Sequence, residues 1–319
     1  ARFNRRTFVF DDDKAAPSFL GRPLPRRSDY VDYVMEGLDR NGSSNPLIGW
    51  CFPIVFDFPE IARNAQFSLT VTDLIADQRP MSQSPNYREK LDASYRATIG
   101  LSDLVLTNCQ PVADAFSDLA PEIHVIPNAC EIIGPERAWE KPIELANLRG
   151  PILGYTGNLR DRLDVELLER ISDQRPDWQI VLIGSAHGSP DILRLQGREN
   201  VHFLGVRPYE EAQAYISHFD VAIMPHVDNE VSQRMNPLKL YVYHALGVPI
   251  VSTDVANIEE IAPYARIAKD GEEFIAEIES ILAKGVDRPR TRPGGEALKP
   301  ISWDDRIERI LKLVDRVGA

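Results

Sequence analysis

Short apolar runs alternate with polar segments of helical length along the first half of the chain. Apolar runs bounded by turn-forming residues are typical of buried strands, and the charged segments between them are long enough for helices. The predicted strands are Arg6–Phe10, Leu47–Val55, Phe67–Val71, Asp103–Asn108 and Ile123–Pro127, and the predicted helices are Asp29–Leu38, Tyr87–Leu101 and Pro111–Leu119. Strands that alternate with helices indicate a parallel sheet with crossover helices.

The stretch from Ala138 to Gly150 is polar and interrupted by proline, which predicts a linker. Beyond it the alternation starts again. The predicted strands are Pro151–Tyr155, Gln179–Ile183, Val201–Leu204, Val221–Met224 and Ile250–Thr253. The predicted helices are Val165–Asp173, Asp191–Leu195, Tyr209–Ile216, a segment after Met235, Ile258–Ile261, Phe274–Leu282 and a last helix from Ser302 to about Val317, with Lys284–Pro300 as a loop.

This order predicts an α/β fold with two Rossmann-like, doubly wound parallel-sheet domains facing a cleft. The first would cover residues 1–140, the second residues 150–300, and the last helix residues 301–319. Ligands of such sheets bind beyond the carboxyl ends of the strands, so the residues that follow each strand are the candidates for chemistry.

Composition narrows the function classes. The chain has 319 residues and a formal net charge of −12, which argues against a nucleic-acid partner because that would need a basic surface. Three scattered cysteines suit a reducing cytosol and give neither a disulfide framework nor a metal site. No apolar run reaches the roughly 18 residues of a membrane span. We therefore expect a cytoplasmic protein.

One lysine occupies an unfavourable place. Asn236 can cap a helix, Pro237 suits its first position and Gly247 can end it, which puts Lys239 in the first turn. A cation there opposes the helix dipole, unless a phosphate shares the helix end with it. Arg162, at the matching end of another strand, favours the phosphate. The alternative is a solvated lysine whose stem packs on the sheet.

Other strand ends offer further candidates. Gly157 follows a strand and lets a ligand approach the backbone closely, although a simple surface loop has the same pattern. The turns at Gly184-Ser185 and Gly205-Val206-Arg207 could together border a flat base. In the first domain Asp73 lies at a strand end, where it could act as a general base or only as a turn acid. The sequence has no paired histidines or cysteines that would predict a metal site.

The motifs in this order resemble those of the GT-B nucleotide-sugar glycosyltransferases, close to the family-four and group-one-like bacterial enzymes. The matching runs are SDLVLTNCQPVADAF, IHVIPNACE, ILGYTGNLRDRLDVELL, WQIVLIGS, NVHFLGVRPYEEAQAYISHFDVAIMP and NPLKLYVYHALGVPIVST, with SWDDRIERIL resembling the helix that crosses back to the first domain. The resemblance implies sugar transfer from a nucleotide diphosphate-sugar to a saccharide or lipid-linked acceptor in polysaccharide or glycoconjugate synthesis. It implies no cofactor and no metal, and peripheral contact with the inner face of the membrane.

The same resemblance assigns residue roles. The donor would lie mainly on the second domain and the acceptor on the first. Asp73 would face the donor as the catalytic residue. The donor-binding residues would be Gly157 and Asn158 near the sugar diphosphate, Arg162 and Lys239 on the phosphates, Val206 and Arg207 beside the base, and Asn236 as a substitute contact for the ribose.

Two positions depart from the family pattern. Relatives carry a glutamate that binds the donor ribose where this chain has Val242, and an earlier glutamate where it has Arg234. Glu230 or Asn236 could supply the ribose contact instead. The departures support an alternative, a non-catalytic GT-B binding or partner protein. A GT-B epimerase is a third hypothesis, for which the sequence shows no cluster of acids and histidine. Relatives also have a strand and a glycine-bearing loop before a segment like RFNRRTFVFDDD, so we expect residues before Ala1.

Overall fold

The chain divides into two compact units in a computed structural model. One unit comprises Ala1–Thr107, Ala113–His124 and Leu313–Ala319, and the other comprises Asn108–Val112 and Val125–Lys312. The structure describes residues 18–19, 22–23, 29–40, 47–53, 55–82, 84–134, 136–160, 162–187, 189–285 and 290–317. The predicted strand Arg6–Phe10 lies outside these ranges.

The first unit contains a sheet in the order β3-β4-β5-β6, in which β3 pairs with β4 and β4 with β5 in parallel. The strands are β3 (Ile48–Cys51), β4 (Leu69–Leu74), β5 (Leu104–Thr107) and β6 (His124–Val125), after a short antiparallel pair, β1 (Ser18–Phe19) and β2 (Arg22–Pro23). The helices are α1 (Tyr30–Arg40), α2 (Phe58–Ala65) and α3 (Pro85–Ile99). The boundary between the two units falls within α4 (Gln110–Ala115), after Val112, and within β6, after His124. The strand predicted to end at Val71 continues to Leu74, so Asp73 is its next-to-last residue.

Helix α2 is absent from the sequence prediction. It is only eight residues long and begins with proline in its first turn, where the ring is tolerated because the first N–H groups have no partner in the helix. Phe58, Pro59 and Ile61 are its buried residues. So short a segment shows too few turns for a helical period to be read from the sequence.

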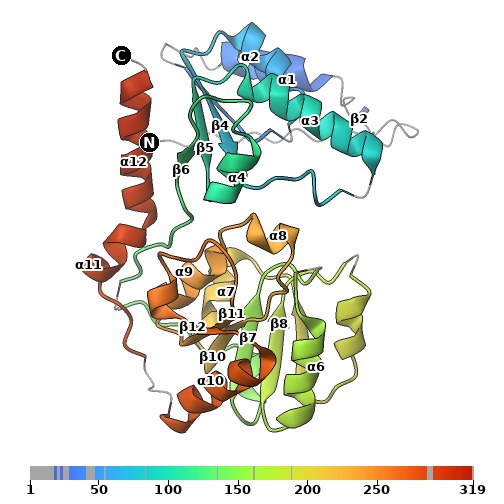
Figure 1. Cartoon of the computed structure of the whole chain (residues 1–319), viewed down its shortest axis with the longest axis vertical. Helices are drawn as coiled ribbons and strands as arrows, with labels where there is room; N and C mark the ends of the chain where they lie inside the picture. The colour runs from blue at the N-terminus through green and yellow to red at the C-terminus, as the bar shows by residue number, and fades with distance from the viewer. Residues whose placement is uncertain are drawn as a thin grey trace. The chain divides into compact units, whose positions relative to one another are not determined.

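The second unit contains six parallel strands in the order β12-β11-β10-β7-β8-β9 (Figure 1). The strands are β7 (Ile152–Thr156), β8 (Gln179–Ile183), β9 (Val201–Gly205), β10 (Val221–Met224), β11 (Ile250–Thr253) and β12 (Arg266–Ala268). The helices are α5 (Ile143–Ala146), α6 (Val165–Gln174), α7 (Tyr209–Ile216), α8 (Glu230–Gln233), α9 (Leu238–Ala245), α10 (Gly271–Ala283) and α11 (Gly295–Leu298), with 3-10 turns η2 (Asp191–Leu195), η3 (Ala262–Tyr264) and η4 (Lys299–Ile301). The last helix, α12 (Trp303–Val317), belongs to this unit up to Lys312 and to the first unit from Leu313.

Two apolar cores cover the two faces of this sheet. Alternate residues of β7 point to opposite faces, with Ile152 in one cluster and Leu153 in the other. Residues of α7 and α9 complete the first cluster, and residues of α6 and α10 complete the second. The unit is therefore a three-layer α/β sandwich, as the alternation of strands and helices predicts.

Several local predictions for this unit are wrong. Residues 259–261 form a turn, followed by η3, in place of the helix Ile258–Ile261. The predicted loop Lys284–Pro300 contains α11 and most of η4, and the predicted linker Ala138–Gly150 contains α5. Strand β12 has only three residues and begins with arginine, so it lacks an apolar run that would predict it.

From β7 the chain adds strands first on one side of the sheet, as β8 and β9, and then on the other side, as β10, β11 and β12. A doubly wound sheet binds its ligands at such a switch point, beyond the carboxyl ends of the two central strands. The residues that directly follow β7 and β10 are therefore the ones to inspect.

Candidate functional site

The loop after β7 approaches the side chain of Lys239 closely. Gly157 has φ of +141°, which glycine adopts far more readily than other residues. A Cβ atom at Gly157 would lie 3.1 Å from Cε and 3.5 Å from Nζ of Lys239. The glycine thus leaves room for the lysine above the strand end, and both it and the neighbouring Asn158 are exposed.

The loop after β8 fixes this arrangement. Gly184 has φ of +149°, and a Cβ atom there would lie 1.7 Å from the carbonyl oxygen of Gly157. The N–H of Gly157 donates to Ile183 O at 2.9 Å, and the N–H of Gly184 donates to Gly205 O at 2.9 Å. The ends of β7, β8 and β9 therefore form one continuous rim, which agrees with the prediction that these turns lie together.

Arg162 is held in the same loop by the segment that follows β10. The N–H of Val227 donates to Arg162 O at 2.8 Å, and the N–H of Asp164 donates to Pro225 O at 2.8 Å. The guanidinium of Arg162 lies 3.4 Å from the sulfur of Met235, a weak acceptor. The backbone of Arg162 is thus fixed, while among the described residues its guanidinium has one side-chain partner, the weakly accepting sulfur of Met235.

Lys239 is the second residue of α9, as the sequence predicts, but the cap differs. Pro237 occupies the N-cap position without a side-chain hydrogen bond, so the prediction of an Asn236 cap is wrong. Its ammonium lies 5.0 Å from the ring centroid of Tyr155, and within the described residues it has neither an ion pair nor a hydrogen bond. Burial, followed by repulsion from Arg162, lowers the pKa of Lys239 to about 7.

Asn236 instead uses its amide to hold the chain. Its Oδ1 accepts the N–H of Asn128 at 2.8 Å, and its Nδ2 donates to Asn257 O at 2.6 Å and to the Tyr241 hydroxyl at 3.2 Å. Asn128 in turn donates its side-chain amide to Asn236 O at 2.6 Å. The buried Asn236 side chain therefore shapes the approach to α9.

Val206 and Arg207 follow β9, on the same rim. Val206 is 68% exposed, which leaves an apolar surface free. Arg207 donates to the hydroxyl of Tyr215 at 3.2 Å and to Glu144 at 3.2 Å, so the protein itself orients its guanidinium. An exposed apolar side chain beside a fixed arginine could border a flat base.

The two positions that depart from the family pattern are both engaged in the protein. Val242 is 7% exposed and belongs to the apolar cluster under α9. Arg234 pairs with Glu230 at 3.0 Å, one helical turn away. Neither side chain offers a carboxylate to a ribose, and Glu230 is partly neutralised by its partner.

Tyr155 and His226 belong to this site but are absent from the predicted set. Tyr155 lies in β7 and His226 is the second residue after β10, and the Tyr155 hydroxyl is 3.1 Å from Nε2 of His226. Both are almost fully buried. A histidine after an apolar strand is the only signal that the sequence holds, and it does not say which partner it meets.

Asp73 lies in the first unit, whereas the predicted donor-binding residues lie in the second. Burial raises the pKa of Asp73 to about 6, although a hydrogen bond from the side chain of Trp50 works in the opposite direction. The neighbouring Asp77 is bound by Arg79, with Nε–Oδ1 at 2.9 Å and Nη2–Oδ2 at 3.0 Å. Of these two carboxylates, Asp73 has the properties of a general base that is ionised near neutral pH.

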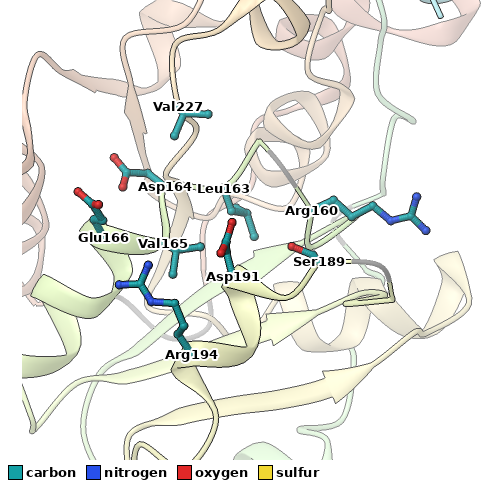
Figure 2. A pocket seen from close by; sticks show the side chains of 9 residues that line it. All are labelled: Arg160, Leu163, Asp164, Val165, Glu166, Ser189, Asp191, Arg194 and Val227. Carbon is teal, nitrogen blue, oxygen red and sulfur yellow. The ribbon is translucent and has the colours of Figure 1, made fainter. Parts of the chain in front are cut away.

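A polar pocket of about 440 Å³ lies beside the N-terminus of α6. In Figure 2 Glu166 and Arg194 lie at the left, Asp191 lies between Arg194 and Ser189, and the Arg160 guanidinium points away from them to the right. Arg194 is bound to Glu169 at 2.6 Å. Neither Arg162 nor Lys239 lines this pocket, although Leu163 and Val227 beside the Arg162 backbone do.

The described residues contain no cluster of three or more histidine, cysteine, aspartate or glutamate side chains placed to hold a metal ion. No helix in the described part of the chain combines the length and the apolar character needed to cross a bilayer.

Comparison with known proteins bears on the fold and on the family that the chain resembles. Residues 150–284, which include the rim described above, match the family model for group 1 glycosyl transferases. Over 200 residues, or 60% of its length, the chain is 25% identical to TuaH of Bacillus subtilis (strain 168), a protein named for a glycosyltransferase of teichuronic acid biosynthesis. The match spans half the length of that relative.

Solved structures show the same architecture. The Anabaena protein Alr3699/HepE, solved in complex with UDP-glucose, has a TM-score of 0.63 at 14% identity, over 93% of this chain and 86% of that one. A UDP-forming trehalose-phosphate synthase from Burkholderia xenovorans has a TM-score of 0.63 at 14% identity, over 92% of this chain and 80% of that one. The predicted fold is confirmed. The chain has the GT-B fold, and its recognition as a relative of the group 1 glycosyltransferases is confirmed, with residues 150–284 matching that family.

Proposed function

We propose that the protein transfers a sugar from a nucleotide diphosphate-sugar to a saccharide or lipid-linked acceptor, without a metal ion, in bacterial polysaccharide or glycoconjugate synthesis. The observation that carries the proposal is the ammonium of Lys239 at the N-terminal turn of α9, beside Arg162 and the open backbone of Gly157, for which the described residues supply no ion pair and no hydrogen bond. A diphosphate would supply a negative charge that the described residues do not place beside Lys239.

The proposed chemistry follows from where charge develops. When the bond between the sugar and the diphosphate breaks, negative charge grows on the leaving phosphate oxygens. Arg162, Lys239 and the N-terminal end of the α9 dipole would stabilise that charge, as a metal ion does in other transferases. Gly157 and Asn158 would lie beside the sugar diphosphate, and Val206 and Arg207 beside the base.

Asp73 is the proposed catalytic residue. A carboxylate with a pKa of about 6 is ionised at neutral pH and basic enough to accept a proton from an acceptor hydroxyl. This role belongs to the same proposal, and so does peripheral contact with the inner face of the membrane. Co-sedimentation with anionic vesicles tests the contact.

Nucleotide binding tests the proposal first. UDP, GDP, ADP and dTDP are titrated calorimetrically, with UDP given priority because HepE was solved with UDP-glucose. Binding of at least one diphosphate, weakened when Arg162 or Lys239 is replaced, is the expected result. Release of that diphosphate from its sugar conjugate in the presence of an acceptor then demonstrates transfer. Failure of all four diphosphates to bind contradicts the proposal.

A second candidate function is that of a non-catalytic GT-B binding or partner protein. Its support is the absence of acid from α9, with Val242 buried in the apolar cluster, together with the pairing of Arg234 with Glu230. The two functions differ in turnover. A nucleotide sugar that binds but releases no diphosphate during prolonged incubation with candidate acceptors favours the binding protein.

A further inference from the structure

Tyr155 and His226, two buried residues that were not predicted from the sequence as site residues, lie between Lys239 and the loop of Arg162. The hydroxyl of Tyr155 and Nε2 of His226 are 3.1 Å apart, and the residues are 1% and 3% exposed. They come from β7 and from the segment after β10, the two neighbouring strands at the switch point of the sheet. This hydrogen bond therefore connects the carboxyl ends of β7 and β10, where a doubly wound sheet binds its ligand.

The pair contacts Lys239 through the ring of Tyr155. The ammonium lies over this ring at 5.0 Å from its centroid, a distance at which a cation is attracted to an aromatic face. Gly157 also lies against the lysine, since a Cβ atom there would be 3.1 Å from Cε of Lys239 and 3.4 Å from the hydroxyl of Tyr155. The ring and the glycine backbone thus confine the lysine.

The pair also reaches Arg162, through the backbone of His226. The residues on either side of His226, Pro225 and Val227, hold the loop of Arg162 by the two hydrogen bonds of 2.8 Å to Asp164 and Arg162. The N–H of His226 is fixed by Thr253 Oγ1 at 3.1 Å, and Thr253 Oγ1 donates to His226 O at 2.7 Å. A change in the position of His226 would therefore move both cations.

We propose that Tyr155 and His226 are positioning residues of the diphosphate subsite, a neutral hydrogen-bonded pair that holds Lys239 and the Arg162 loop in place for the phosphates. This inference rests on the proposed function, because it names the residues that set the geometry of the same site.

The charges around Lys239 support a neutral pair. The described titratable groups that face it are Arg162 from the loop after β7, Tyr155 from β7 and His226 from the segment after β10, and none of them is an acid. Burial, and then the charges of Lys239 and Arg162, hold the pKa of His226 well below its usual range. The imidazole is thus neutral and gives the lysine no counter-charge.

Diphosphate binding should then be linked to proton uptake. With a pKa of about 7 in the free protein, Lys239 is mostly neutral at pH 8, and a bound diphosphate favours its charged form. UDP itself is fully ionised at pH 8, because the second phosphate ionisation lies near 6. Wild-type protein should therefore take up about 0.9 proton per UDP at pH 8. Calorimetry in buffers of different ionisation enthalpy measures this number.

Four variants test the positioning. Tyr155→Phe keeps the ring and removes the hydroxyl, whereas His226→Ala removes the partner and His226→Gln keeps a side chain that can bind the hydroxyl. We expect Tyr155→Phe and His226→Ala each to weaken UDP binding about 3- to 10-fold, the double variant to add little to either, and His226→Gln to restore most of the affinity. Melting temperatures of the ligand-free variants establish that they fold.

The pH profile distinguishes positioning from a general structural effect. In wild-type protein the affinity for UDP should fall by about tenfold per pH unit above pH 7. In Tyr155→Phe and His226→Ala the lysine is less confined, so the fall should begin at a higher pH, and in Lys239→Arg it should be absent. If Tyr155→Phe and His226→Ala both bind UDP with the wild-type affinity and pH profile, the inference is overturned and the proposed function stands. If the wild-type protein binds UDP without taking up protons, the inference is likewise overturned and the proposed function stands. If no diphosphate binds wild-type protein between pH 6 and 9, the proposed function fails and the inference with it.

Discussion

Replacing Lys239 with methionine should make the ligand-free protein more stable. The ammonium is partly buried in the first turn of α9, where burial and then Arg162 lower its pKa from 10.5 to about 7. Methionine has a similar length and flexibility but carries no charge, so it can fill the space above Tyr155 without opposing the helix dipole.

The size and pH dependence of the gain follow from proton binding. Between about pH 7 and 10.5 the folded protein binds fewer protons at Lys239 than the unfolded chain, so the free energy of unfolding of the wild type rises with pH across this window. The shift corresponds to a cost of at most about 5 kcal/mol for the charged lysine near and below pH 7. Because the side chain keeps some contact with solvent, we expect Lys239→Met to gain about 1–3 kcal/mol at pH 7 and much less at pH 10.

Urea unfolding of the ligand-free protein at both pH values measures the gain. Lys269→Met, at an exposed position of the same unit, is the matched control and should change the free energy of unfolding by less than about 0.5 kcal/mol. If Lys239→Met proves less stable than the wild type at pH 7, the contacts of the ammonium in the free protein outweigh the cost of its burial, and the expectation that it needs a bound anion is refuted.

Three further substitutions test other parts of the site. Asp73→Asn should abolish most of the transfer activity, by about 10²- to 10⁴-fold in rate, while it stabilises the protein by up to about 3 kcal/mol above pH 6. Because the pKa of Asp73 is raised, the wild type loses stability as the pH rises from about 4 to 6, so the stability gain of Asp73→Asn should vanish below pH 4. An Asp73→Asn enzyme that keeps its transfer activity would show that Asp73 is not catalytic. Gly184→Ala should displace the carbonyl of Gly157 and cost at least about 3 kcal/mol in urea unfolding, whereas Gly197→Ala, also at positive φ but in open space, should cost about 1 kcal/mol; equal costs would exclude the close approach as the cause. Val242→Glu should lower the melting temperature more at pH 8 than at pH 5, because a carboxylate would replace a valine that is 7% exposed, and a pH-independent effect would contradict that burial.

The fold could be predicted where apolar runs are continuous. The bounds of β8, β10, β11 and α7 agree with the sequence prediction residue for residue. Buried parallel strands are apolar on both faces, so their sequences stand out from the polar segments between them. The three-residue edge strand β12 has no such run, and its pairing with β11 comes only from the assembled sheet.

The candidate site was only partly predictable, because some of its contacts join residues that are far apart in the sequence. Lys239 can be recognised from local rules, because a cation in a first helical turn conflicts with the dipole. The Tyr155–His226 contact joins residues 71 positions apart, and Asn236 contacts a residue 108 positions away. Such pairs depend on the strand order, which local periodicity does not encode. The predicted roles of the site residues, Asp73 among them, stay predictions until ligands are tested.

Calorimetric titration of UDP into the wild type, Lys239→Met and Lys269→Met at pH 7 tests most directly whether the rim above β7 and β10 holds a nucleoside diphosphate. UDP should bind the wild type and Lys269→Met with equal affinity, and Lys239→Met more than tenfold more weakly, a loss of at least about 1.4 kcal/mol. Equal affinity of all three proteins for UDP would contradict the assignment of Lys239, and with it the proposed diphosphate site.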